Sequence, residues 1–279
     1  MIGEIFLETA EIMAIVAVLM VAIEWLEIKF RSRLERWLVK SVKTQIIGAS
    51  LLGAVPGCFD AFLVVSLYTH RLVGFGALVA VMLSTAGDEA FAMLAMIPKE
   101  VLAVFAVCAA LGIVGGFIAE WLARKLKIEP AHPCAIKMHE GESGRNLELT
   151  HFLKEHVWEH IVKKHLPRLF LWVFFTMVAV HLLMGWVDLA AILPQNKLLL
   201  ILLAAVIGII PESGPHLVFL TLYAEGLIPF SVLLVSTLSQ DGHGLLPLLS
   251  HSIRDAVRVQ IFTTLFSLAV GLALFLIGF

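Results

Sequence analysis

GAVPGCFD at residues 53–60 and GIIPESGPH at residues 208–216 each interrupt an apolar segment, the first within residues 45–70 and the second within residues 198–225. Proline and glycine end helices, because proline lacks the N–H donor and glycine has a large backbone freedom. Each remaining arm has about a dozen residues and extends about 18 Å, whereas a hydrocarbon core is about 30 Å thick. The sequence therefore predicts two re-entrant or broken hairpins.

The rest of the chain is too apolar for a soluble domain. Hydrophobic residues make up 60% and charged residues 15% of the chain, with a mean hydropathy of +0.96, whereas soluble domains have about 25% charged residues. Six further segments are long enough to span a bilayer as helices, in which every backbone group is satisfied. They cover residues 5–28, 74–97, 100–123, 169–190, 229–251 and 256–278. Together with the four hairpin arms, they predict an all-α integral membrane protein with about ten hydrophobic segments.

The two interruptions belong to an internal duplication. Shifting the sequence by 155 positions aligns residues 53–98 with residues 208–253 without a gap and gives eleven identical pairs. In so leucine-rich a chain the informative pairs are those of glycine, proline, serine and tyrosine. They are Gly53/Gly208, Pro56/Pro211, Tyr68/Tyr223, Ser84/Ser239 and Gly87/Gly242. Each repeat is expected to contain three spanning helices and one hairpin.

The distribution of basic residues predicts the orientation of the repeats. If both hairpins return to the side from which they enter, 18 of the 20 lysines and arginines lie on one face, which the positive-inside rule identifies as cytoplasmic. Both termini are then outside, and the repeats are inverted. We expect a first transmembrane repeat at residues 1–128, a cytoplasmic histidine-containing linker at 129–167 and a second transmembrane repeat at 168–279. Inverted repeats with interrupted helices are typical of secondary transporters, whose substrate site lies near the midplane.

Polar residues gather at the interruptions and in the middle of segments 74–97 and 229–251. A carboxylate inside a bilayer costs about a few kcal/mol, so it is expected to face a cavity, a cation or a partner. Carboxylates and imidazoles are also the ligands expected for divalent cations such as Mn²⁺ or Zn²⁺. The candidate substrate- or metal-binding residues are Asp88, Glu89, Asp241, His243, Asp60, Glu212 and His216, with Ser84, Ser239, Gln240, Gly87, Gly242 and Cys58 as supporting residues. The same groups could instead carry protons or hold freed backbone groups.

The linker contributes further histidines. His156 and His160 are four residues apart, which places them on one face of a helix at about residues 147–166. A loosely binding metal site is one interpretation. An amphipathic helix lying on the membrane is the other, because neighbours such as Phe152 and Trp158 supply an apolar face.

Three strings carry a resemblance to a known family: STAGDEAFAMLAMIP at residues 84–98, PESGPH at 211–216 and QDGHG at 240–244. They resemble the ten-helix heavy-metal exporters, which are bacterial and archaeal permeases described as arsenic-efflux-like proteins or manganese transporters. The resemblance covers residues 45–98 and 198–255. It implies ten helices and efflux of a metal or metalloid across the cytoplasmic membrane.

Residues and resemblance together favour a secondary active exporter of a divalent heavy metal such as manganese in the cytoplasmic membrane. An arsenical permease would favour thiolates, and only Cys58 lies at an interruption. An organic-anion permease is disfavoured because the interruptions hold carboxylates and no Lys or Arg. An intramembrane metal-dependent hydrolase is also disfavoured, because neither HExxH nor GxSxG occurs, so no enzyme is expected. The expected partners are the lipid bilayer and the metal ion as substrate, without a cofactor or nucleic acid; proton coupling and a homo-oligomer are left open.

Overall fold

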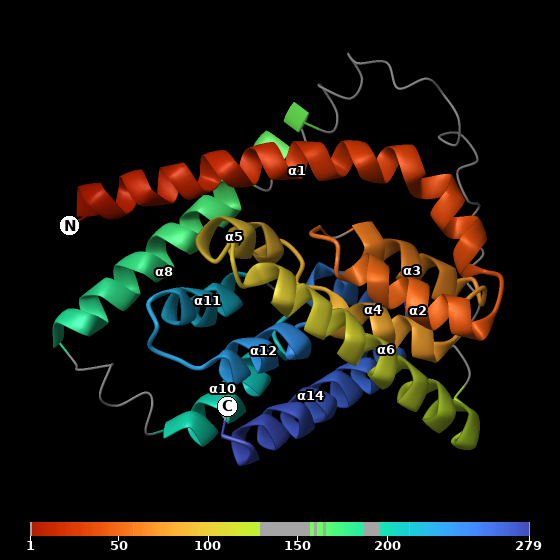
Figure 1. Ribbon diagram of the computed structural model, residues 1–279. Helices are drawn as coiled ribbons and strands as arrows, with labels where there is room; N and C mark the ends of the chain where they lie inside the picture. Colours follow the sequence, from red (N-terminus) through yellow and green to blue (C-terminus); the bar gives the residue numbers. More distant parts are fainter. Residues whose placement is uncertain are drawn as a thin grey trace.

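The computed structural model contains helices joined by turns and extended residues in its described part (Figure 1). The structure describes residues 2–57, 59–128, 157–158, 161–163, 166–186, 196–211 and 213–278. No strand occurs within these ranges. The predicted all-α class is thereby confirmed.

The helix boundaries repeat along the chain. The N-terminal half contains α1 (Ile2–Leu38), α2 (Val42–Gly53), α3 (Phe59–Thr69), α4 (Phe75–Ser84), α5 (Glu89–Met96) and α6 (Val101–Lys125). The C-terminal half contains α8 (Leu166–Trp186), α10 (Lys197–Ile207), η3 (Gly214–His216), α11 (Leu217–Ala224), α12 (Phe230–Ser239), η4 (Gly242–Gly244), α13 (Leu245–His251) and α14 (Ile253–Leu276). Adding 155 to the bounds of α4 gives those of α12, and the same shift places α2 on α10 within one residue. The inversion of one half relative to the other stays a prediction.

The interruptions predicted from glycine and proline are both present. α2 ends at Gly53 before α3 begins, and α10 ends at Ile207 before η3 begins at Gly214. The arms α2, α3 and α10 have 12, 11 and 11 residues. At about 1.5 Å per residue, none of them reaches across a hydrocarbon core.

Segments 74–97 and 229–251, which we expected to be continuous spans, are each interrupted in the middle. α4 and α12 each end at a serine, and the next residue is extended, with ψ of 134° and 123° respectively. Gly87 and Gly242 follow, with φ of +53° and +54°. Glycine adopts a positive φ at little cost, and such a residue cannot continue a right-handed helix. Each segment is therefore a pair of half-helices.

Four described stretches are long and apolar enough to cross a membrane. They are Ile5–Ala22, Phe75–Met96, Val101–Lys125 and Ile253–Leu276. The first lies within α1, which extends well beyond the expected residues 5–28, through the basic residues that follow, to Leu38. The second contains the break between α4 and α5.

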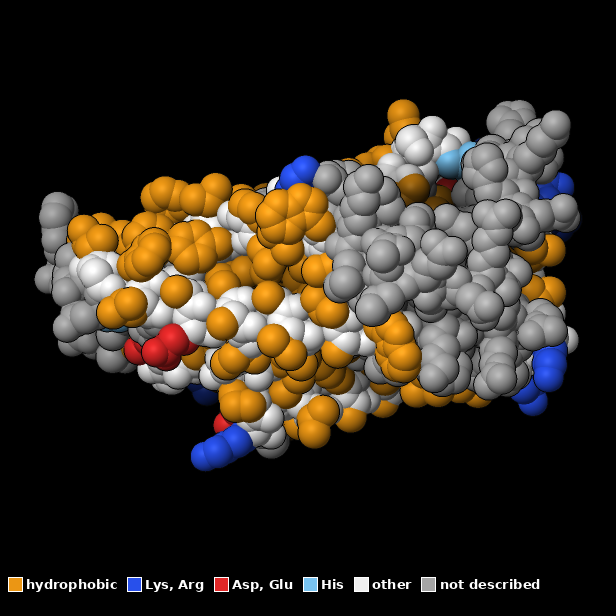
Figure 2. All heavy atoms as spheres, turned by 90° about the horizontal axis from the view of Figure 1, so that it is seen from above, with side chains coloured by type: hydrophobic (Ala, Val, Ile, Leu, Met, Phe, Trp, Pro, Cys, Tyr) orange, Lys and Arg blue, Asp and Glu red, His pale blue; other side chains and the backbone are white. Residues whose placement is uncertain are grey.

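The two faces of α14 differ in composition: the exposed face is apolar and the buried face carries small and polar residues. Its exposed side chains include Ile253, Val257 and Ile261, spaced four residues apart, with exposed fractions of 70%, 47% and 55%. Its buried face carries small and polar residues such as Thr263 and Ser267. An apolar exterior over a more polar interior suits a lipid environment. Figure 2 shows the same pattern on one face, where hydrophobic side chains dominate the described surface and charged ones are scattered.

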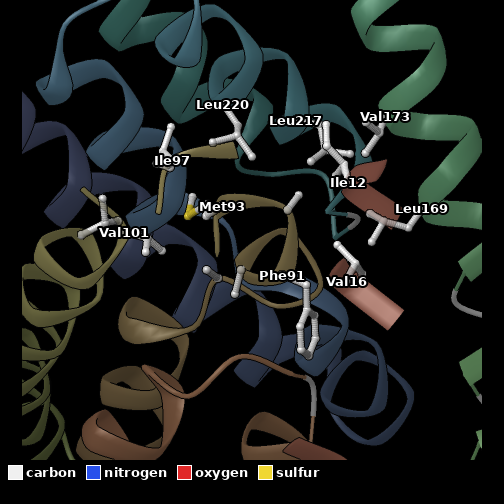
Figure 3. Close-up of a cluster of buried hydrophobic side chains, with 14 of the residues drawn as sticks. Ile12, Val16, Phe91, Met93, Ile97, Val101, Leu169, Val173, Leu217 and Leu220 are labelled. Carbon is white, nitrogen blue, oxygen red and sulfur yellow. The ribbon is translucent and has the colours of Figure 1, made fainter. Parts of the chain in front are cut away.

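α4 lies at the centre of the protein, with every residue buried. It packs against α2 and α6, just as α12 packs against α10 and α14, and α4 and α12 contact each other. A second group of contacts surrounds α5, where side chains from α1, α8 and α11 converge in a hydrophobic cluster (Figure 3). Both termini lie towards the left of Figure 1, whereas α6 ends on the right with Arg124 and Lys125.

Candidate substrate site

The two mid-segment breaks meet in the interior of the protein. Nε2 of Gln240, which follows α12, donates a 2.6 Å hydrogen bond to Oε2 of Glu89, the first residue of α5. Both side chains are fully buried. Because the residues come from different halves, this bond joins the break of one repeat to the break of the other.

The interruptions at residues 53–60 and 208–216, which the sequence predicts to be hairpins, each lie against the break of the opposite half. A Cβ at Gly87 would lie 3.0 Å from Oγ of Ser213, in the second hairpin. A Cβ at Gly244 would lie 2.5 Å from Cβ of Ala61, in the first hairpin, and Asp60 is the residue before Ala61. Correspondingly, α5 packs against α11, and α13 packs against α3. The site is therefore assembled from both halves.

Three carboxylates with unpaired oxygens are buried in these stretches. Asp60, Glu89 and Asp241 are 3%, 0% and 0% exposed. Both oxygens of Asp60, Oε1 of Glu89 and Oδ1 of Asp241 have no hydrogen-bond partner among the described residues. The other oxygen of Asp241 accepts a 3.4 Å bond from Thr263 of α14. A buried carboxylate oxygen without a partner is costly unless a proton or a cation neutralises it.

No lysine or arginine in the interrupted stretches offsets these acids. Lys and Arg are absent from the sequences of residues 53–60, 83–91, 208–216 and 238–244. Asp88, next to Glu89, is 9% exposed and interacts with a neighbouring group. The junction is therefore rich in oxygen donors and electrostatically suited to a cation.

His216 supplies a buried imidazole beside this junction. It lies in η3, is 0% exposed, and its Nδ1 is 2.9 Å from Oγ of Ser236 in α12. Its Nε2 has no hydrogen-bond partner among the described residues. The ring is thus oriented by one nitrogen and has the other free to accept or donate.

The two repeated serines bind the backbone. Oγ of Ser84 donates to the carbonyls of Ala80 and Val81, at 2.8 and 3.2 Å. Oγ of Ser239 donates to the carbonyls of Ala204 and Ser236, at 3.3 and 3.2 Å. Glycine is required opposite each serine, because a Cβ at Gly53 would lie 2.2 Å from Oγ of Ser84 and a Cβ at Gly208 would lie 2.1 Å from Oγ of Ser239. These serines therefore support the helix ends in this conformation.

Several predicted residues fall outside what the structure describes. They are Cys58, Glu212, His156, His160 and the side chain of His243. Within the described part of the chain, no three His, Cys, Asp or Glu side chains come close enough together to hold one metal ion. The acids that are described lie as separate groups on α3, α5 and the break after α12.

Two neighbours of the site could not be found by inspecting the interruptions. Thr263 is on α14, and Cys108 is on α6, in the middle of an apolar run. Cys108 is fully buried and belongs to the same hydrophobic cluster as Ala86 and Ala90, on either side of Glu89 in the chain. Neither residue belongs to a motif, and only the packing of α6 and α14 against the half-helices brings them here.

Comparison with known families gives one match that spans nearly the whole chain. The family described as "Putative, 10TM heavy-metal exporter" matches residues 4–167 and 155–278. Comparisons with curated proteins and with solved structures returned no match.

Proposed function

The chain belongs to the family of multi-pass membrane proteins described as "Putative, 10TM heavy-metal exporter", and we propose that it exports a divalent cation such as Mn²⁺ by secondary active transport. The observation that carries this proposal is the set of buried carboxylates at the junction of the two breaks, with oxygens that have no partner among the described residues. Oxygen donors are the ligands that Mn²⁺ prefers.

Each acid has a distinct place in the proposed pathway. Glu89 and Gln240 present a carboxylate and an amide oxygen at the contact of the two halves, since Oε1 of Glu89 and Oε1 of Gln240 are both without described partners. Asp241, held by Thr263, lies next to Gln240 in the chain. Asp60 lies at the start of α3, in the half of the chain opposite to that of Asp241. Because the groups belong to different halves, a relative movement of the halves would change their spacing and hence their affinity for the ion.

The same acids provide sites for protons on the return step. A carboxylate buried without a basic partner is neutralised either by a proton or by the metal ion, so the two compete for it. His216, with one ring nitrogen free of described partners, is a further proton acceptor. We propose exchange of the metal for protons, in the cytoplasmic membrane, with both termini outside.

The alternatives fit these residues less well. An organic-anion permease needs positive charge at the junction, and the interrupted stretches contain no Lys or Arg. A metal-dependent hydrolase needs a resident metal or a nucleophile with a base, and the chain has neither an HExxH nor a GxSxG sequence. Transport by ATP hydrolysis would require a phosphate-binding motif, and the chain has no GxxxxGK[ST] sequence.

Flux measurements in proteoliposomes test the proposal. Purified protein is reconstituted, and entry of Mn²⁺, Zn²⁺, Cd²⁺ and arsenite is followed with and without an imposed pH gradient. We expect divalent-cation flux that depends on the gradient and is absent from protein-free liposomes. If no metal moves under any gradient while the protein remains folded in the bilayer, the proposal is wrong.

Cys108 is expected to tune the preference among metals. It belongs to the same buried cluster as Ala90, the residue after Glu89, and a sulfur ligand favours softer ions. In Cys108→Ser, the ratio of Cd²⁺ flux to Mn²⁺ flux should fall by about tenfold, a typical effect of changing a group around a metal site. Cys134→Ser, which changes a thiol in the linker, is the control. An unchanged ratio in Cys108→Ser would show that this thiol is only part of the core.

A further inference from the structure

A cavity of about 320 Å³ lies between α1, α5, α8 and α11, apart from the junction of the two breaks. Its lining includes the carboxylates of Glu11 and Glu225, the thioethers of Met96 and Met177, and the side chain of Thr221. Both glutamates are exposed, so the cavity is open at the protein surface. Nothing in the proposed transport site uses these residues.

The polar groups of the cavity come from three separate helices. Glu11 is on α1, Met96 on α5, and Thr221 is one turn before Glu225 at the end of α11. Thr221 is 4% exposed. Two carboxylates with a buried hydroxyl between α5 and α11 are a suitable set of donors for a divalent cation.

The cavity is connected to the junction through α5. Glu89, Met93 and Met96 are spaced four and three residues apart, so they share one face of this helix. The distance along the helix from Glu89 to Met96 is about 10 Å. Met93, which lies between them in the chain, belongs to the hydrophobic cluster of Figure 3, in which it is almost fully buried together with Leu217 and Leu220 of α11. Met93 therefore separates the cavity from Glu89 in this conformation.

We infer that this cavity is a vestibule that binds a divalent cation at one end of the transport pathway, with Glu11 and Glu225 as its charged ligands and the Met93 cluster as its barrier. The inference rests on the proposed function for its place in the pathway. The topology predicted from the basic residues puts Glu11 and Glu225 on the non-cytoplasmic side. The vestibule is thus the release site of an exported ion.

Protection of an introduced thiol tests the vestibule without measuring transport. Ala224→Cys places a thiol in the lining, in a background that carries Cys58→Ser and Cys134→Ser and retains Cys108, which is fully buried. A membrane-impermeant maleimide is applied to proteoliposomes of each orientation, with and without Mn²⁺. We expect modification only from the non-cytoplasmic side, slowed at least about fivefold by Mn²⁺ at a concentration well above its Kd.

The control variants separate the vestibule from the transport site. Protection should disappear in Glu11→Gln/Glu225→Gln and persist in Glu100→Gln, which removes an exposed carboxylate that does not line the cavity. Equal rates with and without Mn²⁺ in a protein that still transports would overturn the vestibule alone, as would protection that survives the double substitution. Protection in a protein that shows no flux would instead retain the cation site and reject the proposed function.

Discussion

Asp241→Asn and Glu89→Gln are each expected to lower Mn²⁺ flux by about 100-fold, which at tenfold per 1.4 kcal/mol corresponds to about 2.8 kcal/mol of lost interaction. Both substitutions keep the shape of the side chain and remove its negative charge. Each carboxylate has an oxygen without a partner among the described residues, so no described bond to that oxygen is lost. The loss should therefore fall on the ion rather than on the fold.

Stability measurements make this expectation specific. Nε2 of Gln240, the donor to Glu89 Oε2, can still bond to the amide oxygen of Glu89→Gln. Neutralising a buried acid that lacks a basic partner also removes a desolvation cost. Both variants should thus have melting temperatures at least equal to that of the unchanged protein. Glu100→Gln, at an exposed carboxylate, should retain full flux.

Near-normal flux in both variants would show that the transported ion does not bind at the junction. Loss of flux together with loss of folded protein would show that the carboxylates hold the breaks together, which is the structural role that the sequence left open. The melting temperature and the flux must therefore be measured on the same preparations. A flux lost in Asp241→Asn alone would assign the ion to the second break.

The hairpin interruptions could be predicted because their cause is local. Proline at positions 56 and 211, following Gly53 and Gly208, ends a helix whatever surrounds it. The duplication could be recognised for the same reason, since the repeated residues include the glycines and prolines that determine the local backbone conformation. The candidates Asp60, Glu89 and Asp241 also followed from a local rule, namely that an ionisable side chain inside an apolar segment is costly and is therefore expected to have a partner or a function.

The mid-segment breaks were harder to predict, because their cause is not local. Gly87 has no other glycine near it in the sequence and Gly242 has only Gly244 nearby, and isolated glycines are tolerated in many helices. At Gly87 the break is next to the other half, because a Cβ there would lie 3.0 Å from Oγ of Ser213, whereas a Cβ at Gly242, which has the same positive φ, would meet nothing within 4 Å. The pairing of Gln240 with Glu89 is likewise a contact over 151 residues that no spacing reveals.

Glycines between α4 and α6 provide the second large expected effect. α4 presents Gly76 and Ala80 on the face that meets Gly112 and Gly116 of α6, an arrangement of small residues that lets membrane helices approach closely. A Cβ at Gly116 would lie 2.8 Å from Cβ of Ala80 and 2.8 Å from the carbonyl oxygen of Gly76. The second of these atoms is backbone, so it cannot rotate away.

Gly116→Leu should therefore force α6 away from α4, which leads directly into the first break. Overpacking of a core typically costs about 1–3 kcal/mol, and for a protein of this size that lowers the melting temperature by about 2–5 °C. The measurement is thermal unfolding in detergent, followed by size-exclusion chromatography. Ala110→Leu is the matched control, because Ala110 is exposed on the opposite side of α6 and a larger apolar side chain there faces lipid.

An unchanged melting temperature in Gly116→Leu, or an equal loss in Ala110→Leu, would show that the close approach of the two helices does not hold α4 in place. A loss confined to Gly116→Leu, accompanied by reduced flux in whatever protein remains folded, would tie the geometry of the first break to the glycine face of α6.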